Sequence, residues 1–283
     1  MKKIISLILL LAAIMSLSAC GGESITMQDV YDAHQLETVL ANNENVHIRV
    51  LGEGQLYIEN YITADLSYED LGSWAMYMTD NSCYLYQNDA YHRVVYIDAE
   101  GLIDMAGYRA ERYGSTLLNP ATLEEDIKSV TKADNHITVT STMSEENVKT
   151  LDETMVSGDF EYVLDAKSLK PVGSKAHYTY DDGSVYNEEI VFEYDAEMPE
   201  GIKPFLEIEQ QTEDLRTVTI VFNSGTEKES TAIVQAPKGM VVGIATKSGG
   251  IGEYEIYTDP DFTQSYEPGD YTSDTTIYIK WLG

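Results

Sequence analysis

The sequence Ala176-His177-Tyr178-Thr179-Tyr180 predicts a β-strand, and the turn-forming sequence Asp181-Asp182-Gly183-Ser184 follows it directly. A second strand is predicted from Glu188 to Tyr194, so that the two strands form a hairpin. Strands joined by so short a turn pair antiparallel, because a parallel connection needs a dozen or more residues. The hairpin therefore predicts an antiparallel sheet.

The same pattern extends toward the N-terminus as short runs of alternating apolar and polar residues. Turn-forming glycine, asparagine and aspartate separate these runs, which are Val46–Val50, Leu56–Ile58, Trp74–Met78, Tyr84–Tyr86 and Val94–Tyr96. Before them, apolar residues recur at helical spacing from about Thr26 to Ala41, which predicts an amphipathic helix. We therefore predict an α+β fold that is mostly antiparallel β.

The order of these elements is similar to that of a known fold. A strand ends at Leu164-Asp165, Ser168-Leu169-Lys170-Pro171 follows, and a long hairpin comes next. Over residues 26–200 this order resembles the periplasmic lipoprotein-carrier (LolA-like) fold. The resemblance implies a curved antiparallel sheet with covering helices and an interior that holds an apolar or amphipathic ligand.

The C-terminal part is predicted to be a separate module. Prolines cluster in Met198-Pro199-Glu200-Gly201 and Lys203-Pro204, which indicates a linker over 201–215. The sequences Tyr257 to Thr263 and Thr275 to Trp281 resemble the internalin-type B repeat, although Glu255-Ile256 replaces the usual Gly-Trp. The resemblance implies a small β-grasp-like module over 216–283 that contacts a surface protein or the envelope. Trp281 is expected to be buried near Phe222 and Phe262.

The N-terminus has the features of an export signal. Lys2 and Lys3 precede an apolar run from Ile4 to Met15, and Leu17-Ser18-Ala19-Cys20 closes the segment. This closing sequence resembles the lipobox of bacterial lipoproteins. The resemblance implies a signal peptide over 1–19, a diacylglyceryl group on Cys20 and a tether over 20–25. We expect a protein anchored by lipid at the extracytoplasmic face of the cell membrane.

The charge excludes one class of partner. The formal net charge is −30, and removal of Lys2 and Lys3 with the signal would bring it to −32. Binding to nucleic acid needs a basic face, so we expect no nucleic-acid partner. An anionic lipid surface would also repel the folded part, which leaves the lipid on Cys20 as the membrane contact. Cys83 then has no cysteine partner, and its place in an apolar strand predicts that it is buried.

The sequence offers no recognisable catalytic motif. It contains no Gly-x-Ser-x-Gly, no phosphate-binding Gly-Lys-Ser/Thr and no His-Glu-x-x-His. The five histidines are scattered without metal-ligand spacing. Asp181-Asp182-Gly183 departs from the calcium-loop spacing and is explained by a hairpin turn. We therefore expect no enzyme activity, no metal and no cofactor.

Tyrosine is unusually frequent, with 21 residues against 5 phenylalanines and 2 tryptophans. Tyrosine rings combine apolar contact with a hydrogen bond, which suits a hydrated groove for sugars, peptides or amphiphiles. Alternatively, these rings fill half-exposed strand positions. The residues that we expect to bind a ligand are Trp74, Tyr77, Tyr84, Tyr86 and Tyr96.

Three functions remain open at this stage. The first is a non-enzymatic surface lipoprotein that binds an apolar or amphipathic ligand and contacts protein or envelope through its C-terminal module. The second is a purely adhesive or scaffolding lipoprotein with a filled core and no small ligand. The third is an envelope hydrolase that uses a pair of acidic residues, for which the sequence gives the least support.

Overall fold

The computed structural model describes residues 29, 32–98, 100–112, 127–143, 149, 152–246, 254–266 and 272–282. The predicted signal peptide, the tether and Cys20 lie outside these residues. The chain divides into two compact units, each made of two stretches of sequence. The first unit is Met1–Ala64 with Gly114–Glu197, and the second is Asp65–Tyr113 with Met198–Gly283.

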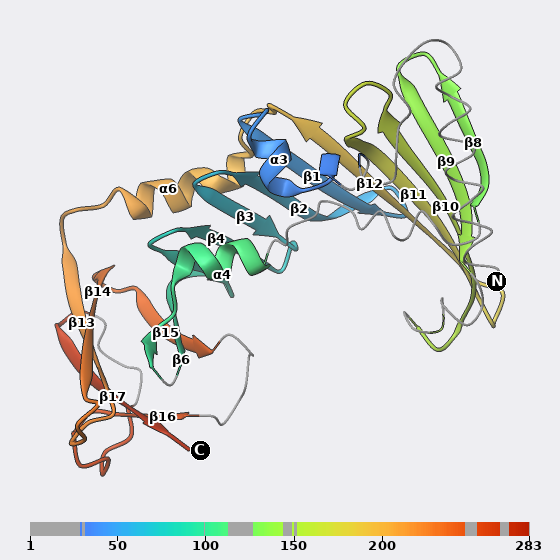
Figure 1. Cartoon of the computed structure of the whole chain (residues 1–283). Coiled ribbons are helices and arrows are strands. Elements are labelled where there is room, and N and C mark those ends of the chain that lie inside the picture. The colour runs from blue at the N-terminus through green and yellow to red at the C-terminus, as the bar shows by residue number, and fades with distance from the viewer. Residues whose placement is uncertain are drawn as a thin grey trace. The chain divides into compact units, whose positions relative to one another are not determined.

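In its described residues, the first unit is an antiparallel sheet with the short helix α3 beside it (Figure 1). Its strands run in the order β2-β1-β12-β11-β10-β9-β8. The elements are α3 (Leu36–Leu40), β1 (Asn45–Gly52), β2 (Gln55–Thr63), β8 (Ile127–Ala133), β9 (His136–Met143), β10 (Met155–Asp165), β11 (Pro171–Tyr180) and β12 (Val185–Tyr194). The predicted hairpin is confirmed, because β11 and β12 pair antiparallel with His177 opposite Asn187.

The two faces of this sheet differ because side chains alternate along each strand. One face is apolar, and its buried cluster contains Ile137, Val139, Tyr162, Leu164 and Leu169. The other face carries charged and polar side chains. Burial of the apolar cluster stabilises the first unit, and the polar face carries the candidate functional site.

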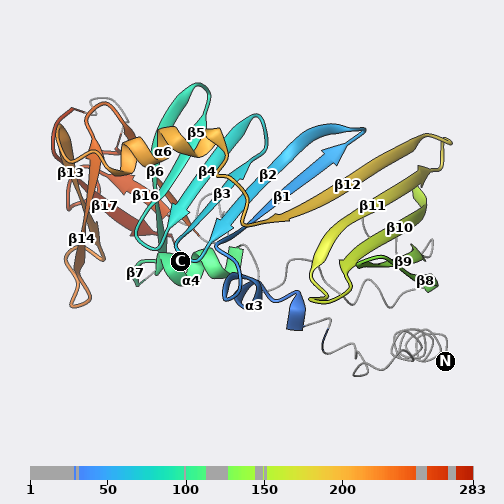
Figure 2. The ribbon, with the colours of Figure 1, turned by 90° about the horizontal axis from the view of Figure 1, so that it is seen from above.

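The second unit contains two sheets (Figure 2). In the first sheet the strand order is β15-β6-β5-β4-β3, with β7 paired to β6, and in the second it is β14-β13-β17-β16. The elements are β3 (Leu66–Asp70), β4 (Trp74–Thr79), β5 (Cys83–Gln87), β6 (Ala90–Asp98), β7 (Gly101–Leu102), α4 (Met105–Arg112), η3 (Glu200–Ile202), α6 (Lys203–Glu209), β13 (Leu215–Phe222), β14 (Ser230–Pro237), β15 (Val241–Thr246), β16 (Tyr254–Tyr257) and β17 (Thr275–Trp281).

The core of the second unit lies between its two sheets. Val95 and Ile97 of β6 share one buried cluster with Val218, Ile220 and Phe222 of β13. Strand β15 pairs parallel with β6, so the C-terminal segment also supplies a strand to the first sheet. The strands of residues 65–113 and the C-terminal strands therefore depend on the same buried apolar surface.

The predicted α+β fold with covering helices is wrong. Among the described residues the first unit has seven strands and the second has ten, and they form mainly antiparallel sheets. Helices α3, α4 and α6 have only 5, 8 and 7 residues, which is too little to cover such a sheet. The helix predicted up to Ala41 is interrupted: Asp29, Asp32 and Ala33 are helical, Gln35 has extended backbone angles, and α3 begins at Leu36.

The predicted β-grasp-like architecture is also wrong. A β-grasp module packs a helix on its sheet, but the described residues of 215–282 contain no helix. A second sheet covers the apolar face instead, since β6 and β15 contribute Val95, Ile97 and Val242 to the shared cluster. Trp281 is half-buried and packs against this cluster, which includes Phe222, whereas the Phe262 ring contacts Tyr257 with ring centres 5.3 Å apart.

The segment predicted as a linker is helical and partly buried. It contains η3 and α6, whose Ile202 and Phe205 are 0% and 1% exposed. Cys83 is buried as predicted, and burial raises its pKa to about 12. In the part of the chain that the structure describes, none of the helices has the length and apolar character to cross a membrane.

Candidate functional site

The polar face of the first unit contains a cavity of about 490 Å³, which we call the polar groove. Strands β9 to β12 form most of it, and Leu51 of β1, Gly54 of the turn between β1 and β2, and Lys128 of β8 complete it. The lining residues are Leu51, Gly54, Lys128, Thr140, Ser141, Asp159, Phe160, Glu161, Lys175, Ala176, His177, Asn187, Glu188 and Glu189.

Strand register brings the polar residues of the groove together. Asp159 lies opposite His177, and His177 lies opposite Asn187 on the next strand. The next row on the same face is two residues away along each strand. In it, Lys175 lies opposite Glu161 on one neighbouring strand and opposite Glu189 on the other. Residues two apart on a strand share a face, so these two rows lie side by side.

The first row is held by hydrogen bonds to Asp159. Its Oδ1 accepts from Lys128 Nζ at 2.8 Å and from Thr142 Oγ1 at 2.6 Å. The hydrogen bond from Lys128, followed by that from Thr142, lowers the pKa of Asp159. Asp159 is therefore ionised at neutral pH and acts as a hydrogen-bond acceptor.

The same row continues to β12. His177 Nδ1 and Asn187 Oδ1 lie 2.8 Å apart, and the backbone N–H of Asn187 donates to Glu53 Oε1 at 2.6 Å. In the second row, Lys175 Nζ lies 3.6 Å from Glu189 Oε1. Exposed ion pairs of this kind stabilise a fold by about 0–1 kcal/mol, so their side chains remain free to turn toward a ligand.

The groove is acidic overall. Two lysines line it, against three carboxylates that share its face, on Asp159, Glu161 and Glu189; Glu188 is adjacent to Glu189 on β12, and its carboxylate accepts a hydrogen bond from Tyr57 instead. The aliphatic stems of Lys128 and Lys175 add apolar surface beside Leu51. The groove can therefore offer hydrogen-bond acceptors, a net negative charge and a limited apolar area.

A cluster of ionisable residues around His47 extends this polar face along β1. His47 Nε2 lies 2.9 Å from Glu59 Oε1, and His47 Nδ1 lies 3.6 Å from Glu193 Oε2. Arg49 Nη2 donates to Glu193 Oε1 at 2.8 Å. His47, Arg49 and Leu51 alternate along one strand, which places the cluster on the same face as the groove.

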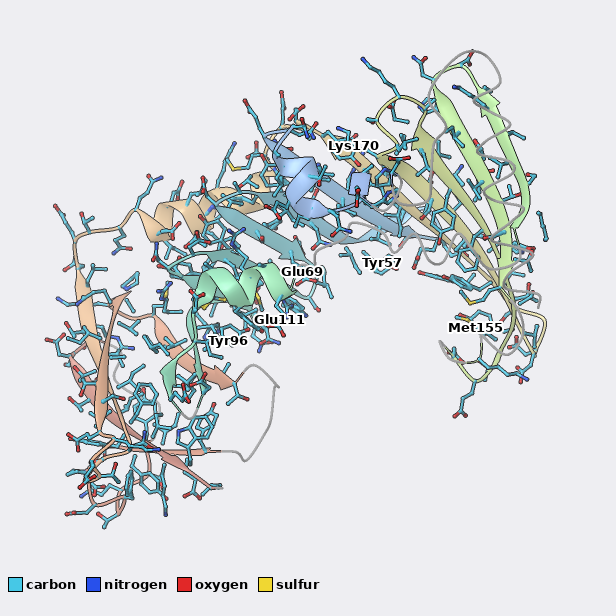
Figure 3. All side chains as sticks on the ribbon, viewed as in Figure 1. Tyr57, Glu69, Tyr96, Glu111, Met155 and Lys170 are labelled. Atoms are coloured by element: carbon cyan, nitrogen blue, oxygen red, sulfur yellow. The ribbon has the colours of Figure 1, made fainter. Side chains whose placement is uncertain are left out.

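The five aromatic residues predicted to bind a ligand lie in the second unit, on both faces of one sheet. Trp74 and Tyr96 pack on the side of α4, where the Tyr96 ring contacts Tyr108 at 4.4 Å. Figure 3 shows Tyr96 close to α4, which carries Glu111. Tyr77 lies three residues from Trp74 on β4 and therefore points to the opposite face.

Tyr77, Tyr84 and Tyr86 share that opposite face, which the chain's own helix α6 occupies. Phe205 of α6 stacks on Tyr77 with ring centres 5.7 Å apart. The Tyr77 hydroxyl donates to Glu209 Oε2 at 2.7 Å, and burial together with this bond raises the pKa of Tyr77. Tyr84 is 6% exposed and lies 6.4 Å from Tyr77, whereas Tyr86 is half-buried. The structure thus does not bring the five residues into one pocket.

The residues of the polar groove are not among those that the sequence predicts to bind a ligand. A signal was present, because β10, β11 and β12 each carry polar residues two apart: Asp159 and Glu161, Lys175 and His177, Asn187 and Glu189. This alternation predicts the strands, but it does not show that the three strands lie side by side. Among the described residues, no group of three or more His, Cys, Asp or Glu side chains is arranged to hold a metal ion.

Comparison with known proteins gives little further information. No family model matches this sequence, and no curated protein matches it. Among solved structures, the chain is similar to one described as the crystal structure of MucB. The alignment covers 74% of each chain with 10% sequence identity and a TM-score of 0.26. A likeness this weak leaves the function to be argued from the residues of this chain.

Proposed function

We propose that this chain is a non-enzymatic, lipid-anchored binding protein of the extracytoplasmic membrane face, and that its polar groove holds the polar part of an amphipathic ligand. The observation that carries the proposal is the groove of about 490 Å³ over β9 to β12. This volume lies within the range of about 300–1,000 Å³ that is usual for small-molecule sites.

The chemistry of the groove favours a particular class of ligand. Its carboxylates accept hydrogen bonds from hydroxyl, amide or ammonium groups, and its net negative charge disfavours anionic ligands. Leu51 and the lysine stems supply a small apolar surface for an adjoining hydrocarbon part. We therefore infer a neutral or cationic amphipathic ligand that is rich in hydrogen-bond donors.

Substitutions in the groove test the binding proposal. Native mass spectrometry of the chain released from its own membranes should detect a retained small molecule. Glu161→Gln combined with Glu189→Gln should weaken its retention about tenfold or more, because each lost charged hydrogen bond costs about 1.5–3 kcal/mol. Glu153→Gln combined with Glu197→Gln is the matched control, since both residues are exposed and lie outside the groove.

Two results would count against the binding proposal. One is the absence of any retained molecule on the unaltered chain, which would favour the adhesive or scaffolding function. The other is equal retention by the groove variant and the control, which would place the ligand elsewhere. Hydrolysis of glycan or ester substrates would instead support the envelope hydrolase.

The anchoring part of the proposal has its own test. Two acyl chains on Cys20 should hold the protein stably, since each buried CH₂ contributes about 0.8 kcal/mol. Cys20→Ser should therefore release the protein from the membrane fraction and abolish palmitate labelling. Cys83→Ser is the control and should leave the labelling intact. Membrane fractionation and labelling that do not change in Cys20→Ser would disprove the anchor.

A further inference from the structure

Strand β14 of the second unit has a free edge that borders a second cavity, of about 210 Å³. Its other edge pairs with β13, where Ile233 lies opposite Thr219 and Gln235 lies opposite Thr217. Ile233, Val234 and Gln235 all line the cavity although their side chains alternate between faces. The cavity therefore runs along the backbone of the edge, and we call it the edge groove.

The free edge can form main-chain hydrogen bonds. On an edge strand, the N–H and C=O groups of every second residue point away from the paired strand. Within the described part of the second unit, no strand pairs with β14 on this side. The edge groove thus has the main-chain groups that an added strand would need.

The side chains around the edge groove are mostly apolar. Ile233 is 66% exposed and Leu102 is 46% exposed, and both line the groove. Leu102 belongs to β7, which lies near β14. Val234, next to Ile233 on β14, turns into the buried cluster instead. Two apolar side chains are therefore displayed on either side of a free strand edge.

Arg93 is the one charged residue that lines the edge groove. Its Nη2 donates to the Asn81 carbonyl oxygen at 3.0 Å, and its guanidinium lies 4.8 Å above the Tyr84 ring. Its Nε and Nη1 atoms have no hydrogen-bond acceptor among the described residues. In a chain of net charge −30, Arg93 is a local positive charge, and no ion pair joins it to a carboxylate among the described residues.

We propose that the edge groove binds an extended polypeptide segment of another protein. The segment adds a strand to β14, places an apolar side chain between Leu102 and Ile233, and directs a carboxylate toward Arg93. The occupant is another protein because two copies of this chain, each at −30, repel one another. The proposal does not depend on the polar groove, which lies in the first unit.

A peptide selection tests this proposal directly. The full chain is used to select from a random octapeptide library displayed with free C-termini, and the affinity of the selected peptides is measured by fluorescence anisotropy. We expect peptides with alternating apolar residues and a carboxylate. Ile233→Lys should weaken their binding about tenfold or more, because a lysine on an edge strand opposes pairing.

The charge is tested separately from the edge. Replacing the peptide carboxylate by an amide should weaken peptide binding to the unaltered chain about tenfold. The same replacement should change binding to the Arg93→Gln variant little. Val185→Lys is the matched control, because Val185 is an exposed strand residue of the first unit, and it should bind like the unaltered chain. Circular dichroism of each variant establishes that it is folded.

Three outcomes would overturn the proposal. The first is a selection that enriches no peptide. The second is equal binding by Ile233→Lys and the unaltered chain. The third is a dimer in sedimentation experiments that Ile233→Lys dissociates, since the edge would then hold a second copy of this chain.

Discussion

Phe205 shows how much one side chain can decide in this protein. Its ring lies among Tyr68, Tyr77 and Tyr91, with ring centres 6.1, 5.7 and 5.2 Å away. It belongs to a proline-bearing segment that the sequence predicts to be an exposed linker, yet it is 1% exposed. Of the tyrosines predicted to contact a ligand on this face, Tyr77 stacks on this helix.

Phe205→Ala should therefore destabilise the second unit strongly. Removing a buried aromatic ring costs about 3–5 kcal/mol through lost contacts and the cavity left behind. Urea unfolding followed by tyrosine fluorescence measures the change in the free energy of unfolding. Glu207→Ala on the same helix is exposed and should change it by less than about 0.5 kcal/mol. Equal effects of the two substitutions would mean that α6 is not packed on the tyrosines.

Among the elements, the turn between β10 and β11 is determined by local sequence. Asp165 Oδ1 accepts the backbone N–H groups of Lys167 at 3.1 Å and Ser168 at 2.6 Å, and the Ser168 hydroxyl at 2.7 Å. Leu169 then takes a left-handed conformation with φ of 60°. A carboxylate that accepts several local donors fixes such a turn.

This turn predicts a pH dependence. The backbone hydrogen bond from Ser168, and then the one from its side chain, lowers the pKa of Asp165 from its usual 3.8. A lowered pKa in the folded state means that the turn stabilises the fold above about pH 4, and that this stabilisation is lost as the pH falls through the folded pKa. Asp165→Asn should reduce the loss of thermal stability between pH 5 and pH 2. Asp195→Asn, with the same charge change elsewhere in the first unit, is the control. An unchanged slope in Asp165→Asn would show that the carboxylate does not hold the turn.

On the scale of the whole molecule, the C-terminal strands share their core with β6. Trp281 packs against this cluster, and its ring lies 5.8 Å from Tyr254. Trp281→Ala should therefore destabilise residues 65–113 and 215–282 together, by about 3 kcal/mol for a half-buried ring. Hydrogen exchange read by mass spectrometry should show both stretches losing protection, while the first unit keeps its protection.

Leu282→Ala is the matched control for this prediction, because Leu282 is 49% exposed beside Trp281. It should leave the exchange of both stretches unchanged. If Trp281→Ala removes protection from 215–282 alone, the C-terminal segment is an independent module, as the B-repeat resemblance implies.

The local elements follow directly from the order of residues. Alternation of apolar and polar residues predicted the strands around Val46–Val50, Trp74–Met78 and Tyr84–Tyr86, which the structure confirms as β1, β4 and β5. The Asp181–Ser184 turn predicted the hairpin of β11 and β12. These signals lie within a few residues of the structure that they specify, because turn chemistry and the two-residue period of a strand are local properties.

Which distant strands pair, and which face of the sheet has a cavity, depends on how the whole chain packs. The spacing of Trp74 and Tyr77 already implies opposite faces, but nothing local shows that Phe205 would cover one of them. Local sequence also does not show that β15 pairs with β6 across a long stretch of chain, or that polar residues of β10, β11 and β12 border one groove. Pairings between distant segments depend on the apolar surface they bury together, and that surface exists only once the chain has folded.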